Sequence, residues 1–428
     1  MPTGIHAFVM AGGCGSRLQP LTDGLCKPAL AFGADHRVVD FVLANLRNSG
    51  VTTVDLLVQY RPEPLIEHVR RRWTRRADAA NPFAVRIARP PERPVGRLGP
   101  AGYRGTADAV FQNLSRAPWG DDDLVAVFGA DHVYRMDLRR MVRHHLAHKA
   151  DVSVAALPVP LAEASGFGVV ETDARGRAIA FHEKPQLPVG MPGRPTHALA
   201  SMGNYLFRAP VLRAALSECC AAGAYDFGHH VLPLLLRRCH VQAYDFRSHA
   251  VAAAGDGEEP GYWRDVGTLD AYFEAQMDIL GPSPRFALDN PRWPLAPRDA
   301  DPQPALVMGG DTRCSRLGSG AVIDRASLDH AVVGAGARVL VDAQLSRCVL
   351  FDGVTVGSGA RLRNVIVAEG NAVPANARIG YDIERDRERF PVSNGGIVVV
   401  PPGHFGAGRS ERVERRERLA EPPLRARG

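Results

Sequence analysis

The chain has 428 residues, of which 45% are hydrophobic and 23% charged, and its formal net charge is +6. This composition is typical of a globular protein with more than one domain and excludes a collagen-like or wholly disordered chain. No nucleic-acid recognition module accompanies the mild positive charge, so we expect no nucleic-acid partner. No apolar run is long enough to cross a bilayer, and no secretory segment precedes the first strand. We therefore expect a cytoplasmic protein without membrane contact.

The cysteines and the clustered histidines show no metal-ligand spacing. The seven cysteines contain no Cys-x-x-Cys pair, so neither a zinc site nor a disulfide framework is indicated. His144, His145 and His148 could share a helix, but no acidic or thiol partner lies nearby in the sequence. We interpret these histidines as a solvated helix face.

A glycine-rich turn follows the first predicted strand, with the pattern Gly-Gly-x-Gly-x-Arg-Leu at residues 12–18. Glycines let backbone N–H groups approach a polyphosphate closely, and Arg17 and Lys27 can neutralise phosphate charge. The Gly-Lys-Ser/Thr of a Walker motif is absent, and Leu18 stands where a dinucleotide fingerprint has its third glycine. The turn therefore predicts a nucleoside triphosphate site, with a purely structural glycine turn as the alternative.

Strand-like and helix-like segments alternate through the first two-thirds of the chain. This rhythm predicts an α/β domain with a mostly parallel sheet covered by helices. Ligands of such sheets bind beyond the carboxyl ends of the strands, so the glycine turn and Asp131 are expected to share one crevice. We expect strands at residues 8–10, 54–58, 85–87 and 124–128, and helices around residues 42–46, 65–69 and 106–111.

The pattern changes after a proline-rich stretch at residues 281–304, which we interpret as a linker. Beyond it, aliphatic residues recur every six positions, as at Val333, Val339 and Leu345. This period predicts a hexapeptide-repeat parallel β-helix, with ordinary short strands as the alternative. The predicted domains are a catalytic domain at residues 1–280, a β-helix at 305–400 and a charged, disordered tail at 401–428.

Further segments carry residues suited to phosphate chemistry. Asp131 ends an apolar strand, and Asp265 lies among aromatic residues and glycine. Glu183 and Lys184 are an adjacent acid and base, and residues 102–108 open a helix whose N-terminus could receive an anion or a base edge. Singly, these could be a helix cap, a turn or a surface ion pair. Together with the glycine turn they form the set of carboxylates and cations that a divalent metal and phosphates require.

These segments, in this order, resemble bacterial ADP-glucose pyrophosphorylase (glucose-1-phosphate adenylyltransferase) over nearly the whole chain. The resemblance implies a Rossmann-like nucleotidyltransferase domain followed by a left-handed parallel β-helix, assembled as a homo-oligomer. It implies in-line attack of a sugar 1-phosphate on the α-phosphate of ATP, with Mg²⁺ as cofactor and pyrophosphate leaving. The similar segments are residues 11–18, 38–41, 59–60, 103–109, 129–134, 167–169, 183–185, 200–203 and 262–268.

The resemblance also assigns roles to individual residues. The catalytic residues are Arg17, Lys27, Asp131, Lys184 and Asp265, and the expected metal ligands among them are Asp131 and Asp265. The expected nucleotide contacts are Ala11, Gly12, Gly13, Gly15, Gln59, Gly105 and Thr106. The expected sugar-phosphate contacts are Tyr103, Gly168, Glu183, Lys184, His197 and Ser201.

Several positions depart from the family pattern, and two of them bear on the binding of sugar phosphates. His197 aligns with a lysine that contacts the sugar phosphate in several members, and a mostly neutral imidazole is a weaker phosphate ligand. Asp35 stands where enteric members have a lysine linked to sugar-phosphate activators, and an acid there should repel such an activator. An alternative is therefore the same transfer to a cyclitol phosphate of the valienol 1-phosphate type, in pseudo-oligosaccharide biosynthesis. A second alternative, a non-catalytic regulatory subunit, is disfavoured by the retained catalytic residues.

Overall fold

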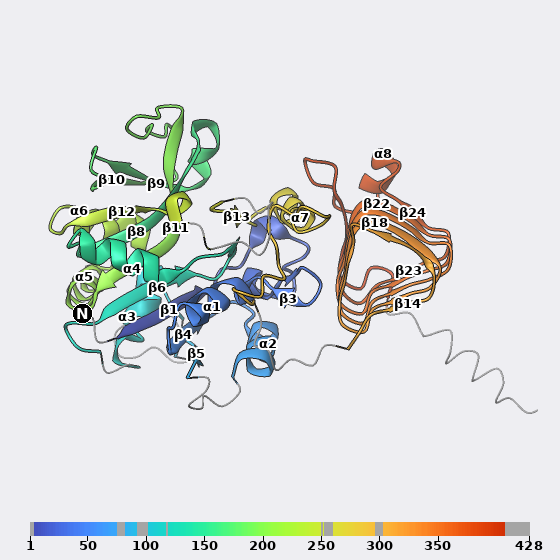
Figure 1. Cartoon of the computed structure of the whole chain (residues 1–428), viewed down its shortest axis with the longest axis horizontal. Helices are drawn as coiled ribbons and strands as arrows, with labels where there is room; N and C mark the ends of the chain where they lie inside the picture. The colour runs from blue at the N-terminus through green and yellow to red at the C-terminus, as the bar shows by residue number, and fades with distance from the viewer. Residues whose placement is uncertain are drawn as a thin grey trace, which may run out of the picture. The chain divides into compact units, whose positions relative to one another are not determined.

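The structure, a computed structural model, contains two compact units, whose elements are labelled in Figure 1. Unit 1 comprises Met1–Leu30, His36–Ile279 and Ser283–Asp301, and unit 2 comprises Ala31–Asp35, Leu280–Pro282 and Pro302–Gly428. The residues that the structure describes are 4–74, 82–91, 102–116, 119–249, 251, 260–295 and 303–406.

Two expectations concern the ends and the surroundings of the chain. The predicted disordered tail lies outside the described residues from position 407 onward. Within the described ranges, none of the helices has the length and apolar character needed to span a membrane.

Unit 1 is built on a nine-stranded sheet. Its main path is β10 (Ala178–Glu183), β9 (Gly168–Thr172), β11 (His197–Arg208), β6 (Leu124–Gly129), β1 (Ile5–Ala11), β4 (Thr53–Val58) and β5 (Ala84–Ala88), and β8 (Val152–Pro160) pairs with β11 and with β12 (Val241–Asp245). Strands β6, β1, β4 and β5 are parallel, as the alternating pattern predicted, whereas β11 runs antiparallel to β6 and β8. The glycine turn therefore leaves the sheet at the carboxyl edge of its parallel half.

Helices pack along this sheet and confirm the helical segments expected from the sequence. They are α1 (Val39–Asn48), α2 (Glu63–Trp73), α3 (Thr106–Phe111), α4 (Leu138–Ala147), α5 (Ala209–Ala221), α6 (Leu232–Leu236) and α7 (Leu269–Met277). A continuous apolar core joins the central strands to α3, α5 and α6 through buried residues such as Phe8, Val127 and Phe207. Burial of this apolar surface is the main source of the stability of unit 1.

Two small ladders each have two strands. One pairs β2 (Ala31–Phe32) with β3 (His36–Arg37), where the chain passes from unit 2 to unit 1, and the other, in unit 1, pairs β7 (His132–Tyr134) with β13 (Trp263–Asp265). In the second ladder the strands are antiparallel and Asp265 lies opposite His132. This pairing brings Asp265 beside the segment that carries Asp131, although the two aspartates are far apart in the sequence.

The first part of the proline-rich stretch packs on unit 1 and differs in this from the expected linker. Phe286, Trp293 and Leu295 are buried, and Trp293 Nε1 donates a hydrogen bond of 2.9 Å to Asn45 Oδ1 on α1. These apolar side chains explain why this stretch clusters with unit 1 rather than extending freely between the units.

Unit 2 is a parallel β-helix, as the hexapeptide period predicted. One sheet contains β14 (Leu306–Val307), β17 (Val322–Ile323), β19 (Arg338–Val339), β21 (Thr355–Val356) and β23 (Ala372–Val373). The other contains β15 (Gly310–Arg313), β16 (Arg316–Leu317), β18 (Ala326–Val333), β20 (Gln344–Leu350), β22 (Arg361–Val367), β24 (Arg378–Ile379) and β25 (Val398–Val400). A short helix, α8 (Ile383–Arg387), precedes the last strand.

The coils of unit 2 stack in a regular register. Gln344 lies beside Arg361, 17 positions further along the chain, and the residues that turn each corner repeat at the same interval. At one corner, His330, Arg347 and Asn364 all have φ near +50°. Val333 and Val339 are buried in the aliphatic interior, which confirms the pattern that predicted the fold.

Residues 31–35 belong to this second unit. Asp35 Oδ1 accepts a hydrogen bond of 2.8 Å from the backbone N–H of Ser319, and Arg316 Nε donates one of 3.0 Å to Gly33 O. Asp35, which the sequence singled out as an obstacle to activators, therefore has a structural partner in the first coils of the β-helix.

Candidate active site

The glycine turn begins at the carboxyl end of β1. Ala11 is buried at the end of the strand, whereas Gly12 and Gly13 are exposed. Gly15 has φ +63°, and a Cβ at this position would come within 3.1 Å of Lys27 Cβ. Both the left-handed backbone and the close approach require glycine here. The turn is thereby packed directly against Lys27.

Lys27 connects two carboxylates from distant parts of the chain. Its Nζ donates hydrogen bonds of 3.1 Å to Asp131 Oδ2 and 2.8 Å to Asp265 Oδ1, and its side chain is only 7% exposed. Asp131 follows β6 and Asp265 ends β13, so the carboxyl edge of the sheet brings the three residues together. The glycine turn and Asp131 are thus close neighbours through Lys27, as their positions after strand ends predicted.

The charges of this group reinforce one another. Burial opposes ionisation of Asp131, but the charges of His132 and Lys27 outweigh it and hold the pKa of this carboxyl well below its usual range. Burial also favours the neutral amine of Lys27, but Asp131 and Asp265 outweigh it and raise the pKa of this lysine. Near neutral pH the carboxylate of Asp131 is therefore negative and the lysine positive.

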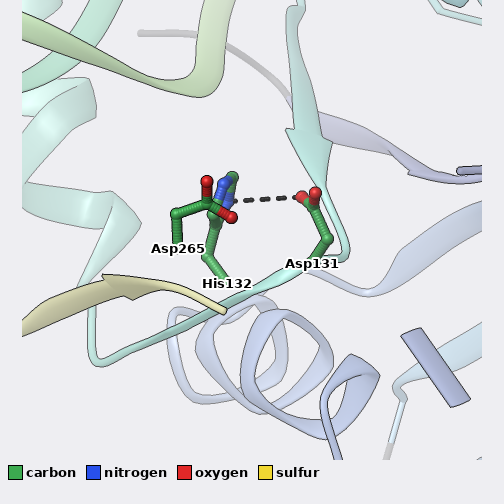
Figure 2. A group of neighbouring side chains, drawn as sticks. All are labelled: Asp131, His132 and Asp265. Atoms are coloured by element: carbon green, nitrogen blue, oxygen red, sulfur yellow. Dashed lines mark ion pairs between the residues drawn. The ribbon is translucent and has the colours of Figure 1, made fainter. Parts of the chain in front are cut away.

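His132 is a member of this group that the sequence reasoning missed. Its ring nitrogen and the carboxylate oxygens of Asp131 and Asp265 all lie within 4.8 Å of one another (Figure 2). The only sequence signal was its position directly after Asp131, and a single histidine next to a strand end rarely identifies a site. The ladder between β7 and β13 creates the grouping.

The group of Asp131, His132 and Asp265 suits a divalent cation. Carboxylate oxygens are the ligands that Mg²⁺ prefers, and two of them converge from different strands. The Nδ1 atom of His132 is buried and has no hydrogen-bond partner among the residues that the structure describes. A bound cation or a water molecule would supply this atom with a partner.

Arg17 lies next to this group. Gly267 lies between Arg17 and Asp265. A Cβ at this position would come 2.9 Å from Arg17 Nη2 and 3.0 Å from both carboxylate oxygens of Asp265, so both side chains pack against this glycine. The guanidinium, which is exposed, therefore extends the same cluster of charges toward solvent.

Gln59 joins the glycine turn to the segment around Tyr103. Its side chain packs against Gly12, and it accepts a hydrogen bond of 3.0 Å from Tyr103 N and donates one of 3.2 Å to Tyr103 O. The hydroxyl of Tyr103 instead faces the interior, where Asn113 Nδ2 donates to it at 3.0 Å. Tyr103, an expected sugar-phosphate contact, therefore lies beside Gln59, an expected nucleotide contact.

The N-terminus of α3 is not open to an anion, contrary to the expectation from the sequence. The carbonyl oxygen of Tyr225 accepts hydrogen bonds from Ala107 N at 2.8 Å and from Asp108 N at 3.4 Å. Thr106 Oγ1 donates to Asp226 Oδ2 at 3.0 Å. Gly105 is needed because a Cβ would meet Tyr225 O at 2.4 Å. Gly105 and Thr106 therefore have structural partners of their own.

Glu183 sits between two glycines. It pairs with Gly168 across β9 and β10, and a Cβ at Gly228 would lie 2.5 Å from its Oε2. Gly228 belongs to a single π-helical turn, Phe227–Val231, a conformation often found at functional sites. The sequence reasoning did not identify Gly228. Lys184, next in the chain, is exposed, and its Nζ lies 3.5 Å from Glu183 Oε1.

His197 and Ser201 lie on β11. Thr196 Oγ1 and His197 Nδ1 are 3.0 Å apart, and partial burial together with the charges of Arg194 and Arg247 lowers the pKa of His197. Ser201 is buried, and its hydroxyl accepts a hydrogen bond from Gly203 N at 3.2 Å, beside a bulge in the strand. Neither residue has a contact with the Lys27 group in the part of the chain that the structure describes.

Comparison with known protein families agrees with this geometry. The nucleotidyl transferase family model matches residues 6–281, and the model for a GlmU-like C-terminal hexapeptide matches residues 307–400. The chain is therefore a nucleotidyltransferase with a C-terminal hexapeptide-repeat domain, an α/β protein of the predicted class.

Similar proteins narrow the assignment. Those from Thermodesulfovibrio yellowstonii and an Anaeromyxobacter species are both 41% identical, over 93% and 92% of this chain and 96% and 97% of their own. One from Deinococcus radiodurans is 40% identical, over 94% of this chain and 98% of its own. All three are named glucose-1-phosphate adenylyltransferase. This chain belongs to the glucose-1-phosphate adenylyltransferase family.

Proposed function

We propose that the chain transfers the AMP moiety of ATP to glucose 1-phosphate, forming ADP-glucose and pyrophosphate. The observation that carries the proposal is the salt-bridged group of Lys27, Asp131 and Asp265 beside the glycine turn. Two similar proteins that align with this chain over nearly their whole length are named for this reaction. Such a product would make the chain an enzyme of glycogen synthesis.

Mg²⁺ is the proposed cofactor, with Asp131 and Asp265 as its protein ligands. When bound, it would neutralise charge on the phosphate oxygens during the transfer. The chain's own residues supply the rest of the electrostatics. Arg17 is proposed to bind the departing pyrophosphate, and Lys27 and Lys184 to bind phosphate groups.

The acceptor is proposed to bind at Glu183, whose carboxylate can accept hydrogen bonds from ring hydroxyls. Gly168 and Gly228 pack closely against this carboxylate and restrict where it can lie. A second candidate acceptor is a cyclitol 1-phosphate, and His197 is the residue that favours it. Because its pKa is lowered, it offers less positive charge to a sugar phosphate at neutral pH than a lysine does.

Pyrophosphate release by the purified chain with Mg²⁺ tests the proposal. ATP, GTP, UTP and dTTP are each combined with glucose 1-phosphate and with valienol 1-phosphate. We expect the fastest release with ATP and glucose 1-phosphate. A strong preference for the cyclitol would instead establish the second candidate, and no release with any pair would support a regulatory subunit.

We also propose that the chain forms a homo-oligomer, a dimer or a tetramer, as the family resemblance implies. Light scattering coupled to size-exclusion chromatography at micromolar concentration tests this directly. A single peak with the 46.2 kDa mass of one chain would contradict it.

A further inference from the structure

The group around Asp131 contains a nitrogen donor as well as two carboxylates. We infer that His132 Nδ1 is a third protein ligand of the divalent cation, so that the site binds Mn²⁺ and Co²⁺ through a nitrogen that Mg²⁺ uses poorly. This inference rests on the proposed function, because it concerns the metal that Asp131 and Asp265 are proposed to hold.

The spacing of the three donor atoms fits one ion. Ligands of Mn²⁺-sized or Zn²⁺-sized ions lie about 2.0–2.2 Å from the metal, so two ligands on opposite sides are roughly 4.0–4.4 Å apart. The donor atoms of Asp131, His132 and Asp265 already lie within 4.8 Å of one another. Three atoms within this distance of one another lie no more than about 2.8 Å from a common centre, so a shift of roughly 0.6 Å or less in each side chain would bring all three to bonding distance.

The imidazole nitrogen is available for this role. His132 Nδ1 is buried without a hydrogen-bond partner in the described ranges, and the side chain is 13% exposed. Its contact with Asp131 Oδ1, drawn as a dashed line in Figure 2, is 3.4 Å long, which exceeds an ordinary hydrogen bond. Leaving a buried polar atom without a hydrogen bond costs about 1–3 kcal/mol. A metal ion between this nitrogen and the carboxylates would remove that cost.

Lys27 does not block the position. It donates to Oδ2 of Asp131, whereas His132 faces Oδ1 of the same carboxylate. At Asp265, Lys27 binds Oδ1, which leaves Oδ2 for another partner. The ammonium and a metal ion can therefore share the two carboxylates through different oxygens.

The surroundings hold the ring in place. The ring of His132 packs on that of Trp263, with centroids 5.0 Å apart, and the β7–β13 ladder pairs His132 with Asp265. A Cβ at Gly129 would lie 2.9 Å from Asp131 Oδ1 and 3.5 Å from His132 Cε1. The absence of a side chain at position 129 leaves room for both donors. Figure 2 shows the side chains of Asp131 and His132 close together.

The chemistry of the donors gives the expected selectivity. Imidazole nitrogen suits transition metals, whereas Mg²⁺ strongly prefers oxygen. Loss of the imidazole should therefore weaken Mn²⁺ binding much more than Mg²⁺ binding. A purely structural role of His132 would affect both ions alike.

The test uses the full chain with Mn²⁺ and α,β-methylene-ATP, an analogue that cannot be cleaved at the α-phosphate. Electron paramagnetic resonance measures bound Mn²⁺, and spin-echo modulation detects a nitrogen bound to it, with ¹⁵N-histidine labelling to identify its source. The variant is His132→Asn, with His132→Gln as a second variant. The matched control is His330→Asn, because His330 also follows an aspartate, lies within 2.9 Å of it and is exposed on the β-helix.

We expect histidine nitrogen modulation in the wild type and in His330→Asn, and its loss in His132→Asn. We also expect Mn²⁺ affinity to fall by about tenfold or more in the variants while Mg²⁺ affinity changes by less than about threefold. Unlabelled wild-type protein without nitrogen modulation, or unchanged Mn²⁺ affinity in both variants, would overturn the inference.

Asp131→Asn separates this inference from the proposed function. If that variant loses Mn²⁺ while His132→Asn retains it, the carboxylate site stands and the histidine ligand is wrong. If neither variant alters Mn²⁺ binding, the metal site of the proposed function itself is wrong. The wild-type spectrum decides the ligand even if a variant folds poorly.

Discussion

The two units of this chain differ in how many polar side chains they bury. Of the 21 buried polar or charged residues among the described ones, 19 lie in unit 1, and only Asn371 and Asp386 lie in unit 2. Both exceptions bind backbone groups at the end of the β-helix. The β-helix interior is otherwise aliphatic, as in the column formed by Val333, Val339 and Leu345.

This difference shows which interactions determine the stability of each unit. A repeated aliphatic coil needs only neighbouring contacts, so its structure follows from a short sequence period. Unit 1 instead keeps charged groups such as Lys27 and Asp40 out of water, which is costly unless each is paired. Changes to buried charges should therefore affect unit 1 strongly, and matched changes in the β-helix should have little effect.

The largest expected effect is that of Asp131→Asn. This substitution removes one of two negative charges of the proposed metal site without changing the shape of the side chain. We expect pyrophosphate release to fall by at least about 10³-fold, because charge stabilisation dominates this chemistry. The matched change Asp329→Asn, which also precedes a histidine, should leave the rate unchanged. If Asp131→Asn retained more than about a tenth of the rate, the proposed role of Asp131 as a metal ligand would be wrong.

Replacement of Lys27 should have a somewhat smaller effect. Lys27→Met keeps most of the unbranched side chain but leaves Asp131 and Asp265 without their shared cation, so kcat/KM should fall by about 10²-fold. Without that cation the pKa of Asp131 should rise, and the acid limb of the pH–rate profile should move to higher pH. Steady-state kinetics from about pH 3, below the ordinary pKa of an aspartate, to about pH 9 measures both effects. Lys149→Met, at an exposed lysine, is the control and should behave as the wild type.

The pH dependence of stability should also distinguish the units. The interpretation of His145 as a solvated residue is wrong, since it is buried and its Nδ1 lies 2.9 Å from Ser153 Oγ. Burial, with a smaller contribution from Arg208, lowers its pKa to about 4 from an ordinary 6.5. Between these values the unfolded chain binds a proton that the folded chain does not. The stabilisation is therefore complete above pH 6.5 and is lost as the pH falls toward 4.

Scanning calorimetry of the full chain at several pH values in this range measures the effect. The unfolding transition of unit 1 should lose up to about 3 kcal/mol in acid, and that of the β-helix should change much less. In His145→Gln, which keeps a polar partner for Ser153, this part of the acid sensitivity should disappear. An equal shift of both transitions in the wild type would contradict the contrast between the units.

The smallest effects compare two glycines that both have open space around a hypothetical Cβ, Gly13 and Gly353. Gly353 has φ +69° at a β-helix corner, so Gly353→Ala should cost about 1 kcal/mol of stability without changing activity. Gly13 has no such backbone strain, so Gly13→Ala should leave the unfolding midpoint unchanged. It should raise the KM for ATP about fivefold or more if the triphosphate approaches this backbone. The reverse pattern would place the nucleotide elsewhere.

Much of the fold could be predicted because its signals are local. Each expected strand and helix of the first two-thirds falls within an observed element, and the six-residue period corresponds to the β-helix. The antiparallel course of β11 was not predicted, because the direction of a strand depends on its neighbours rather than on its own residues. The packing of residues 283–295 in unit 1 was not predicted, because the many prolines indicated a linker although Phe286 and Trp293 are buried.

The candidate site was predicted in part. Lys27, Asp131 and Asp265 do meet, because strand-end positions on a parallel sheet predict a common edge. His132 and Gly228 were missed, and Thr106 has another partner, Asp226. Each of these depends on which distant backbone segment lies beside it, and no short motif records that information.

The amino-acid sequence by itself determined the repeat of the β-helix, the alternation of strands and helices, and the residue types available for phosphate chemistry. These properties depend on backbone propensity and on the spacing of apolar residues along a short stretch. Only the tertiary structure decided which donors share a site. The β7–β13 ladder places Asp265 beside His132, and Lys27 lies between two carboxylates 104 and 238 positions away in the sequence. Such grouping is decided by long-range packing, since chain separation does not limit which side chains meet in a folded core.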